Sequence, residues 1–224
     1  MYNKLTLVIP AKNEKESLPT VLDELKKYDL KKLIVLEPSD KETINAIKEY
    51  DCQLIYQSNK GYGDAIKLGI KNVKTDYFSI FNADGSFNPS ELENMLELLE
   101  SNQADIVFAS RYEKDCGTQD DTIITYIGNF IFTKLGNIFF KLNVTDILYT
   151  YVIAKTDCIK KLDLKKNDFR LCVELPIKAK RAGINIKTSK SYERRRISGK
   201  KKVNAIRDGF YILLEMIRLF FVKN

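Results

Sequence analysis

The sequence predicts an α/β fold: a mostly parallel, twisted sheet flanked by helices, followed by a helical extension at the carboxyl end. Short apolar strands alternate with amphipathic helices through the first half of the chain, which implies a parallel, doubly wound sheet. Polar and glycine-containing loops follow the predicted strands, at the edge where such sheets bind ligands. The chain has 224 residues, 44% of them hydrophobic, which is enough for one domain with a substantial core.

The first half of the chain contains the clearest strand and helix signals. Short apolar runs predict strands at 5–10, 33–36, 53–56, 77–81 and 105–109. Between them, apolar residues recur at helical spacing around 18–25, 44–50 and 65–70. A further helix is expected over 89–101, with Pro89 at its first position, where proline is favoured.

The second half is less regular. A long apolar-rich helix is expected over 122–142, a short strand at 152–154, a helix at 173–182 and a strand at 184–188. A basic loop follows over 192–203. The last helix, 203–222, carries a polar stripe and a very wide apolar face. We see no repeat or linker, so residues 1–224 are interpreted as a single domain.

Composition excludes several classes of chemistry. The chain has no histidine, which removes His-based nucleophile pairs and His-ligated metals. Its four cysteines show no CxxC spacing, so a zinc ribbon is not expected and a reducing, cytoplasmic compartment fits. We see no signal peptide, and polar residues such as Asn129, Lys134 and Glu215 interrupt the longest apolar stretches.

Charge is distributed unevenly. Residues 178–224 contain 14 Lys/Arg and three Asp/Glu, a local balance of +11, whereas the preceding 177 residues sum to −4. A basic carboxyl-terminal quarter indicates an anionic partner, such as a nucleotide diphosphate, a lipid phosphate, an anionic membrane surface or nucleic acid. Aromatic residues near the basic loop are sparse, which argues against nucleic acid.

The segment Asn82-Ala83-Asp84-Gly85-Ser86 is the strongest candidate for chemistry. It follows a buried strand directly, where an α/β sheet places its ligand. Asp84, Asn82 and Ser86 offer hard oxygen atoms to a divalent cation. The alternative is an ordinary strand-to-turn junction, since all these residue types except alanine favour turns.

Three further loops lie after predicted strands. In Pro10-Ala11-Lys12-Asn13-Glu14, Glu14 could accept hydrogen bonds from a base or ribose; otherwise it starts a helix. Glu37 is the second such candidate, in a loop whose alternative role is a helix cap formed with Asp40. Lys60-Gly61-Tyr62-Gly63 opens a helix, where glycine permits close backbone approach to a phosphate.

In this order, these segments resemble the inverting family 2 glycosyltransferases with the GT-A fold, a Rossmann-like fold. Val8-Ile9-Pro10-Ala11-Lys12-Asn13-Glu14 is similar to the family's opening strand and loop, and Lys60 to Ala65 with Gly69 to its glycine segment. Asn82-Ala83-Asp84 stands where the family carries its Asp-x-Asp metal motif, and Ser110-Arg111 matches its short Ser-Arg. The resemblance implies a nucleotide-binding half over 1–115, an acceptor half over 116–202 and an amphipathic helix over 203–224.

The basic loop narrows the resemblance. Arg196-Ile197-Ser198-Gly199-Lys200-Lys201-Lys202 is similar to a signature of dolichyl-phosphate mannose synthase and other polyprenyl-phosphate glycosyltransferases. This implies that Arg196 and Lys202 contact phosphates. Three positions depart from the pattern: Asn82 replaces an acid, Leu36 precedes Glu37 where two acids are common, and Lys201 replaces a serine.

The resemblance implies a hexosyltransferase-like, metal-dependent enzyme. Its donor is a nucleotide diphosphate sugar of UDP or GDP type, bound by Pro10, Ala11, Asn13, Glu14, Glu37, Lys60, Gly61, Asn82, Ala83, Asp84, Arg196 and Lys202. Mg²⁺ or Mn²⁺ on Asp84, Asn82 and Ser86 neutralises the leaving diphosphate. A glycan hydroxyl acceptor requires a general base, for which Asp146 is the candidate. A polyprenyl phosphate is largely ionised at neutral pH and needs only positioning, for which Arg111 is the candidate.

Other interpretations stay open at this point. The chain could be a catalytically impaired relative that binds nucleotide sugar as a partner subunit, since Asn82 removes a charge. Asp146 could be a turn residue and Arg111 part of a structural ion pair. The last helix could contact the inner face of a membrane, as in cell-envelope polysaccharide synthesis, or pack on the protein's own core or a second subunit.

Overall fold

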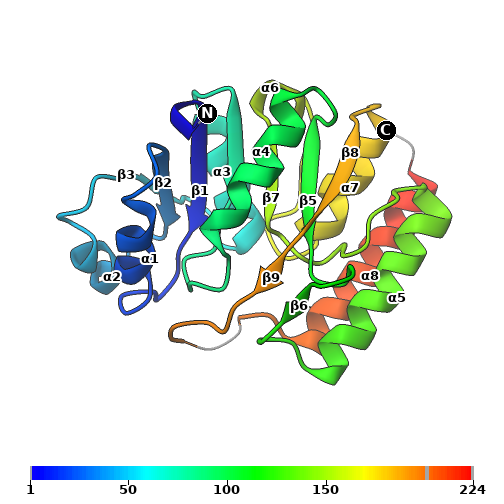
Figure 1. Ribbon diagram of the computed structural model, residues 1–224. Helices are drawn as coiled ribbons and strands as arrows, with labels where there is room; N and C mark the ends of the chain where they lie inside the picture. Colours follow the sequence, from blue (N-terminus) through cyan, green and yellow to red (C-terminus); the bar gives the residue numbers. More distant parts are fainter. Residues whose placement is uncertain (1, 200–201, 223–224) are drawn as a thin grey trace.

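The computed structural model describes residues 2–199 and 202–222, which form a seven-stranded sheet covered by helices on both faces (Figure 1). The strand order is β3-β2-β1-β4-β7-β5-β8. All neighbouring strands pair in parallel except β7, which runs antiparallel between β4 and β5. The predicted α/β fold with a mostly parallel sheet is therefore confirmed.

The first half follows the expected alternation. Its elements are β1 (Leu5–Pro10), α1 (Leu18–Leu25), β2 (Lys31–Leu36), α2 (Lys41–Ala46), β3 (Gln53–Tyr56), α3 (Tyr62–Asn72), β4 (Tyr77–Ile80), α4 (Leu92–Glu100) and β5 (Ile106–Ser110). Short 3-10 turns lie at Tyr2–Lys4 and Pro89–Glu91. The helix expected from Pro89 thus begins as a 3-10 turn, with Asn88 accepting a hydrogen bond from the Ser90 amide.

The second half contains β6 (Gly117–Thr118), α5 (Ile123–Phe140), β7 (Val152–Lys155), α6 (Thr156–Lys160), α7 (Leu171–Arg181), β8 (Ile186–Lys190), β9 (Tyr192–Glu193) and α8 (Ala205–Phe221). The short ribbon of β6 and β9 lies apart from the main sheet. Neither this ribbon nor α6 was predicted, because segments of two to five residues carry too little periodicity.

Two apolar layers sandwich the sheet. One face packs against α1, α2 and α4, around residues such as Leu22, Phe87 and Leu96. The other packs against α3, α7 and parts of α5 and α8, around residues such as Ile66, Ile177 and Met216. Because both faces are covered, the strands are buried and their carboxyl ends are left as the accessible edge for a ligand.

Helices α5 and α8 lie side by side at one end of the sheet (Figure 1). Phe139 of α5 contacts Phe220 of α8, with ring centroids 5.5 Å apart. Many of their apolar residues are exposed, whereas Ile212, Met216 and Leu219 of α8 are buried, so the last helix packs part of its wide apolar face on the protein's own core. By length and apolar composition, α5 also qualifies as a helix that could cross a membrane, although the sequence suggested no such segment.

Candidate functional site

Asp84 lies in a tight turn at the carboxyl end of β4. Its Oδ1 atom accepts hydrogen bonds from the Ser86 amide (3.0 Å) and the Ser86 hydroxyl (2.7 Å). Gly85 in the turn has φ +82°, a conformation that other residues rarely adopt. The Asp84 side chain is mostly buried, at 13% exposure, and its Oδ2 atom lies 3.5 Å from Nη1 of Arg196. The turn therefore fixes one carboxylate at the expected ligand edge.

Asn82 is connected to this carboxylate through a chain of hydrogen bonds. Its amide nitrogen donates to Ser86 Oγ (3.4 Å), and its Oδ1 atom accepts from the Tyr62 hydroxyl (3.4 Å). Tyr62 is also 2.7 Å from Thr150 Oγ1. Burial raises the pKa of Tyr62, so its hydroxyl stays protonated at neutral pH. An aspartate at position 82 could not donate to Ser86, which gives a physical reason for the amide.

The basic loop after β9 lies against the Asp84 turn. The Arg194 amide donates to the Ser86 carbonyl (2.9 Å), and the Ile197 amide donates to the Asp84 carbonyl (2.8 Å). Arg194 also forms a paired contact with Glu24, at 2.8 and 2.9 Å. These bonds anchor the start of the loop over the carboxyl end of β4, whereas Lys200 and Lys201 lie outside the described residues.

Arg196 bridges two carboxylates at this edge. It lies 3.5 Å from Asp84 Oδ2, and its Nη2 atom donates to Asp120 at 2.8 Å. Burial alone would lower the pKa of Arg196, but the hydrogen bond to Asp120 and the charge of Asp84 raise it. Asp120 escaped the sequence analysis because no local pattern links residues 76 positions apart.

Glu14 and Lys202 come together as a second ion pair. The Glu14 side chain is almost fully buried and also accepts a hydrogen bond from Ser17 Oγ at 2.5 Å. The Glu14 amide donates to Thr43 Oγ1 at 2.9 Å, which joins the loop after β1 to α2. Two residues assigned to the donor by separate motifs are thus direct neighbours, and Lys202 neutralises the buried carboxylate.

The loops after β1 and β2 hold Glu37 at the rim. Glu37 pairs with Lys12 at 2.9 Å, and the hydrogen bond from Lys12 lowers the pKa of Glu37. The exposed Lys60 contributes to the same shift. Asp40 accepts from the Asn13 amide (2.7 Å) and from the Thr43 amide (3.3 Å), so it caps α2, as the alternative interpretation expected.

At Pro10, Ala11 and Ala83 the side chains carry no polar group, so only the backbone could bind a ligand there. Ala11 and Ala83 are buried in the core, and the Ala11 amide donates to the Val35 carbonyl at 2.9 Å. Asn13 adopts φ +54°, a left-handed conformation that asparagine tolerates. Contact of Pro10, Ala11, Asn13 and Ala83 with a donor stays a prediction.

Gly61 and Gly63 pack against the protein's own chain. A Cβ atom at Gly61 would lie 2.1 Å from the Asn167 carbonyl oxygen, and one at Gly63 would lie 2.5 Å from the Lys166 carbonyl oxygen. Glu174 accepts hydrogen bonds from the Lys165 and Lys166 amides, which holds this segment in place. The glycines are therefore required for packing, and a phosphate contact at Gly61 stays a prediction.

The structure does not support the catalytic role predicted for Asp146. Its carboxylate has no exposed side-chain surface. It accepts hydrogen bonds from the Arg111 amide (3.1 Å), from Arg111 Nε (2.7 Å) and Nη2 (3.0 Å), and from Asn129 Nδ2 (2.8 Å). A general base needs a free lone pair within reach of the acceptor hydroxyl, and this carboxylate offers none.

The Arg111 side chain likewise forms its contacts inside the protein. Besides Asp146, it contacts Glu193 at 3.0 Å and Asp121 at 3.4 Å, and its guanidinium lies 4.4 Å from the centre of the Tyr149 ring. Its side chain is 8% exposed. The predicted binding of an acceptor phosphate by Arg111 is not supported, because the guanidinium joins β5, the β6–β9 ribbon and the loop before β7 as a structural ion cluster.

The Asp84 turn suits a hard divalent cation that is shared with a phosphate. Asp84, Asn82 and Ser86 supply one carboxylate, one amide and one hydroxyl oxygen. Among the described residues there is no group of three or more His, Cys, Asp or Glu side chains that could hold a metal alone. Mg²⁺ commonly binds one or two carboxylates together with substrate phosphates, so this donor set fits such an ion.

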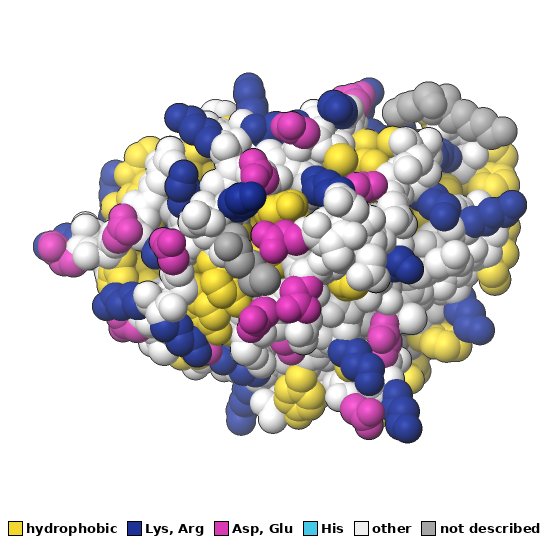
Figure 2. Space-filling model, turned by 45° about the horizontal axis from the view of Figure 1, so that its top comes forward, with side chains coloured by type: hydrophobic (Ala, Val, Ile, Leu, Met, Phe, Trp, Pro, Cys, Tyr) yellow, Lys and Arg dark blue, Asp and Glu magenta, His cyan; other side chains and the backbone are white. Residues whose placement is uncertain are grey.

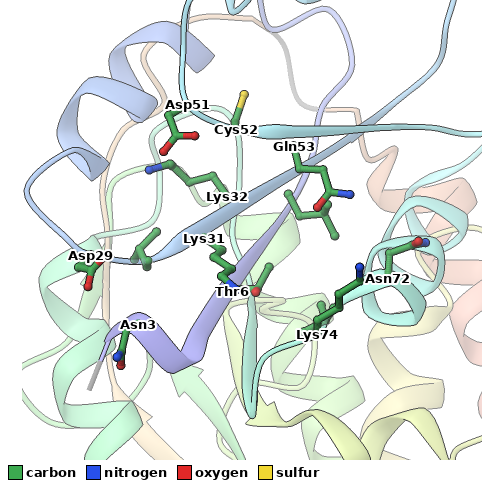
Figure 3. Close-up of a pocket in the computed structure, with 13 residues that line it drawn as sticks. Asn3, Thr6, Asp29, Lys31, Lys32, Asp51, Cys52, Gln53, Asn72 and Lys74 are labelled. Atoms are coloured by element: carbon green, nitrogen blue, oxygen red, sulfur yellow. The ribbon is translucent and has the colours of Figure 1, made fainter.

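A cavity lies at the opposite edge of the sheet. It measures about 360 Å³ and is bordered by the amino-terminal ends of β1, β2 and β3, with Lys31, Lys32 and Lys74 among its lining residues (Figure 3). Basic and acidic side chains are interspersed over the face that comes forward in Figure 2. The chemistry-bearing residues thus gather away from this cavity, at the carboxyl ends of the strands, where α/β sheets bind ligands.

Comparison with known proteins decides the family. Residues 6–162, well over half of the chain, match the family described as Glycosyl transferase family 2. The chain belongs to this family. The match includes β1, the Gly61 segment, the Asp84 turn and Arg111, but ends before the basic loop.

Two relatives illustrate the range of similarity. The low-salt glycan biosynthesis hexosyltransferase Agl6 of Haloferax volcanii is 24% identical over 192 residues, which cover 82% of this chain and 46% of Agl6. The chain therefore spans about half the length of that relative. A UDP-N-acetylglucosamine–dolichyl-phosphate N-acetylglucosaminyltransferase of Methanococcus voltae is 24% identical over 215 residues, covering 83% of this chain and 84% of the relative.

Solved structures support the same fold. Glucosyl-3-phosphoglycerate synthase of Mycobacterium tuberculosis, in complex with Mn²⁺, UDP and its product, has a TM-score of 0.78 at 13% identity, covering 98% of this chain and 81% of that one. A second complex of that enzyme, with Mg²⁺ and UDP, has a TM-score of 0.76 at 12% identity, with 98% and 80% covered. At such low identity the likeness establishes the fold, and the GT-A prediction is confirmed.

Proposed function

We propose that this protein is an inverting glycosyltransferase that moves a sugar from a nucleotide diphosphate to a phosphate-bearing acceptor of the polyprenyl phosphate class. The observation that carries the proposal is the meeting of Asp84, Glu14, Arg196 and Lys202 at the carboxyl ends of β1 and β4. Two carboxylates and two cations from distant parts of the chain converge there, where α/β sheets bind ligands.

Each group has a role in donor binding. Glu14 and Glu37 would accept hydrogen bonds from the ribose or base, with Lys202 leaving Glu14 to meet the diphosphate. Arg196 would stabilise the negative charge that develops on the leaving nucleotide diphosphate. Asp84, Asn82 and Ser86 would hold Mg²⁺ or Mn²⁺, which when bound neutralises the diphosphate. The relatives crystallised with Mn²⁺ or Mg²⁺ and UDP support this assignment.

The class of acceptor is inferred from the absence of a general base at Asp146. A sugar hydroxyl must lose its proton during attack, and the predicted base is buried and fully hydrogen-bonded. A phosphate monoester has a second pKa of about 6 and attacks as an anion, so it requires no base. The dolichyl-phosphate acceptor in the name of the Methanococcus relative favours the same acceptor class.

Binding and transfer assays test the proposal. Thermal shifts with UDP, GDP, CDP and dTDP, each with and without Mn²⁺, identify the donor base, because a ligand of the folded state raises the melting temperature. The corresponding UDP- or GDP-sugars are then offered with a short-chain prenyl phosphate or the matched prenol. We expect transfer to the phosphate and none to the alcohol, with loss of transfer in Asp84→Ala.

Two outcomes would contradict the proposal. Transfer to a glycan hydroxyl, but not to prenyl phosphate, would refute the acceptor class. Nucleotide binding with no turnover of any donor would favour the alternative, a catalytically impaired partner subunit.

A further inference from the structure

Helices α5 and α8 leave many of their apolar residues exposed while they bury polar ones. In α5 the buried residues are Asn129, Thr133 and Gly136. In α8 the carboxylates Asp208 and Glu215 are buried beside a narrow apolar stripe of Ile212, Met216 and Leu219. We call the exposed residues of these two helices the α5/α8 face; its members include Ile124, Phe130, Ile131, Phe210, Leu214 and Ile217.

Ion pairs and hydrogen bonds hold the polar sides of both helices on the protein. Glu215 of α8 contacts Lys166 at 2.7 Å, and Asn129 of α5 donates to Asp146 at 2.8 Å. Burial would raise the pKa of Glu215, but the hydrogen bonds from Arg218 and Lys166 lower it below its ordinary value. These buried polar contacts, together with the apolar contacts of Ile212, Met216 and Leu219, fix the orientation of the helices, and the remaining apolar residues are left facing outward.

The α5/α8 face is large for a water-exposed surface. Phe130 and Phe210 are 55% and 58% exposed, and Ile123 and Ile206, at the amino ends of the two helices, are 79% and 81% exposed. Two adjacent helices of this length cover about 27 Å by 20 Å, or about 500 Å², which is near the upper limit for a soluble monomer. Such a surface indicates a partner.

A groove within this face is almost wholly apolar. It measures about 160 Å³ and lies between the carboxyl-terminal halves of α5 and α8, where Leu135, Phe139, Leu213 and Ile217 are among its lining residues. Its volume suits a segment of hydrocarbon chain, because apolar cavities of this size hold apolar groups and stay dry. The groove thus fits the acyl or prenyl chain of a lipid.

The charges of the two helices identify the chemistry of the partner. Asp208 and Glu215, both in α8, are the carboxylates of the two helices, and both are buried, so the face exposes none. It does carry the exposed cation Lys134, whose Nζ lies 5.3 Å from the centre of the Phe130 ring, whereas Arg207 is paired with Asp208 at 3.0 Å. In a two-fold dimer through this face, Lys134 would meet no exposed carboxylate on α5 or α8 of the second copy. An anionic lipid surface supplies both the apolar layer and the opposite charge.

The face begins at the rim of the candidate site. The N-cap of α8, Asn204, follows Lys202 by two residues, and Lys202 contacts Glu14. The N-cap of α5, Thr122, follows Asp120 by two residues, and Asp120 holds Arg196. Both helices therefore start where the donor-binding residues lie and run away from them side by side (Figure 1).

We infer that the α5/α8 face is a docking surface for an anionic phospholipid bilayer, with both helices lying in the plane of the interface and the donor site held beside the lipid headgroups. The inference rests on the proposed function in one respect: docking on the bilayer would bring a membrane-held phosphate acceptor to Arg196 and Lys202. It does not rest on transfer activity for its test.

Tryptophan reporters provide that test, because the chain contains no tryptophan. Phe130→Trp and Phe210→Trp are placed on the face, and Tyr56→Trp serves as the matched control, since Tyr56 is similarly exposed at the end of β3. Full-length protein is mixed with vesicles of phosphatidylcholine alone, with phosphatidylcholine–phosphatidylglycerol vesicles, and with the same lipids brominated in the acyl chains. Flotation and tryptophan emission are both recorded.

We expect flotation with the anionic vesicles, and a blue shift with bromine quenching for the reporters at 130 and 210 but not at 56. Lys134→Glu reverses one cation and should weaken binding to anionic vesicles at least about fivefold. No flotation, or equal quenching at all three positions, would overturn the inference. A blue shift of the tryptophan emission without vesicles, together with a concentration-dependent dimer in sedimentation, would also overturn the inference. It would indicate that a second copy of the chain covers the α5/α8 face. UDP binding, measured on the same samples, tests the donor site separately.

Discussion

The assignment of Asp146 to structure rather than to catalysis makes a quantitative prediction. In Asp146→Ala, the buried Arg111 loses a carboxylate that accepts three of its hydrogen bonds, at 2.7, 3.0 and 3.1 Å. Removing one partner of a buried ion pair costs about 3–5 kcal/mol, because the remaining charge is left uncompensated. Glu193 stays 3.0 Å from Arg111, so the lower end of this range applies, about 3 kcal/mol.

The assay is thermal unfolding, followed by circular dichroism or calorimetry. For a chain of this size, a loss of about 3 kcal/mol lowers the melting temperature by about 6–12 °C. Asp163→Ala is the matched control, since Asp163 forms an exposed ion pair with Lys165 at 3.0 Å. We expect its melting temperature to stay within about 2 °C of the parent protein.

The competing interpretation predicts the opposite pattern. If Asp146 were the general base, Asp146→Ala would unfold near the parent temperature and bind UDP normally, yet lose transfer. That result would refute the structural assignment and restore a hydroxyl acceptor. The isosteric Asp146→Asn variant, which keeps one acceptor oxygen for Arg111, should lose less stability than Asp146→Ala.

Three further predictions concern packing, charge and pH. Gly61→Ala should lower the melting temperature by several degrees, since its Cβ would lie 2.1 Å from the Asn167 carbonyl oxygen, and calorimetry would contradict this by finding no change. Arg196→Gln should weaken UDP binding in the absence of metal about tenfold, as measured by titration calorimetry. The same variant should bind Mn²⁺ more tightly in the absence of nucleotide, because a cation 3.5 Å from Asp84 is lost. Unchanged affinities would count against a contact of Arg196 with phosphate. Folding lowers the pKa of Glu215, so its stabilising effect is present above pH of about 4.5 and is lost as the pH falls through the folded pKa. The difference in melting temperature between the parent protein and Glu215→Gln should therefore shrink between pH of about 7 and about 3.5. A constant difference would contradict the ion pairs of Glu215.

Much of the site could be predicted from sequence because its residues lie in local patterns. Asp84 follows a buried strand and precedes a glycine, and Glu14 follows another, so both were expected at the carboxyl edge of a parallel sheet. The pairing of Glu14 with Lys202 was not foreseeable, because those residues are 188 positions apart. The partnership of Arg196 with Asp120 was missed for the same reason.

Arg111 and Asp146 show the limit of reading residue types. Both are chemically suited to catalysis, and sequence alone cannot decide whether such groups face a ligand or each other. The fold places β5 beside β7, so the loop that precedes β7 brings Asp146 to Arg111 in the interior. The same fold buries Asp208 and Glu215 of α8 beside Ile212, Met216 and Leu219, and leaves much of the wide apolar face of this helix exposed.

The sequence alone determined the class of sheet, the edge at which a ligand is expected and the family to which the chain belongs, because these follow from local periodicity and short motifs. Only the tertiary structure decided which charged groups are free for chemistry and which are paired, and which side of α5 and α8 meets the solvent. The physical reason is that ion pairing and burial depend on contacts between residues far apart in the chain, and no local pattern encodes them.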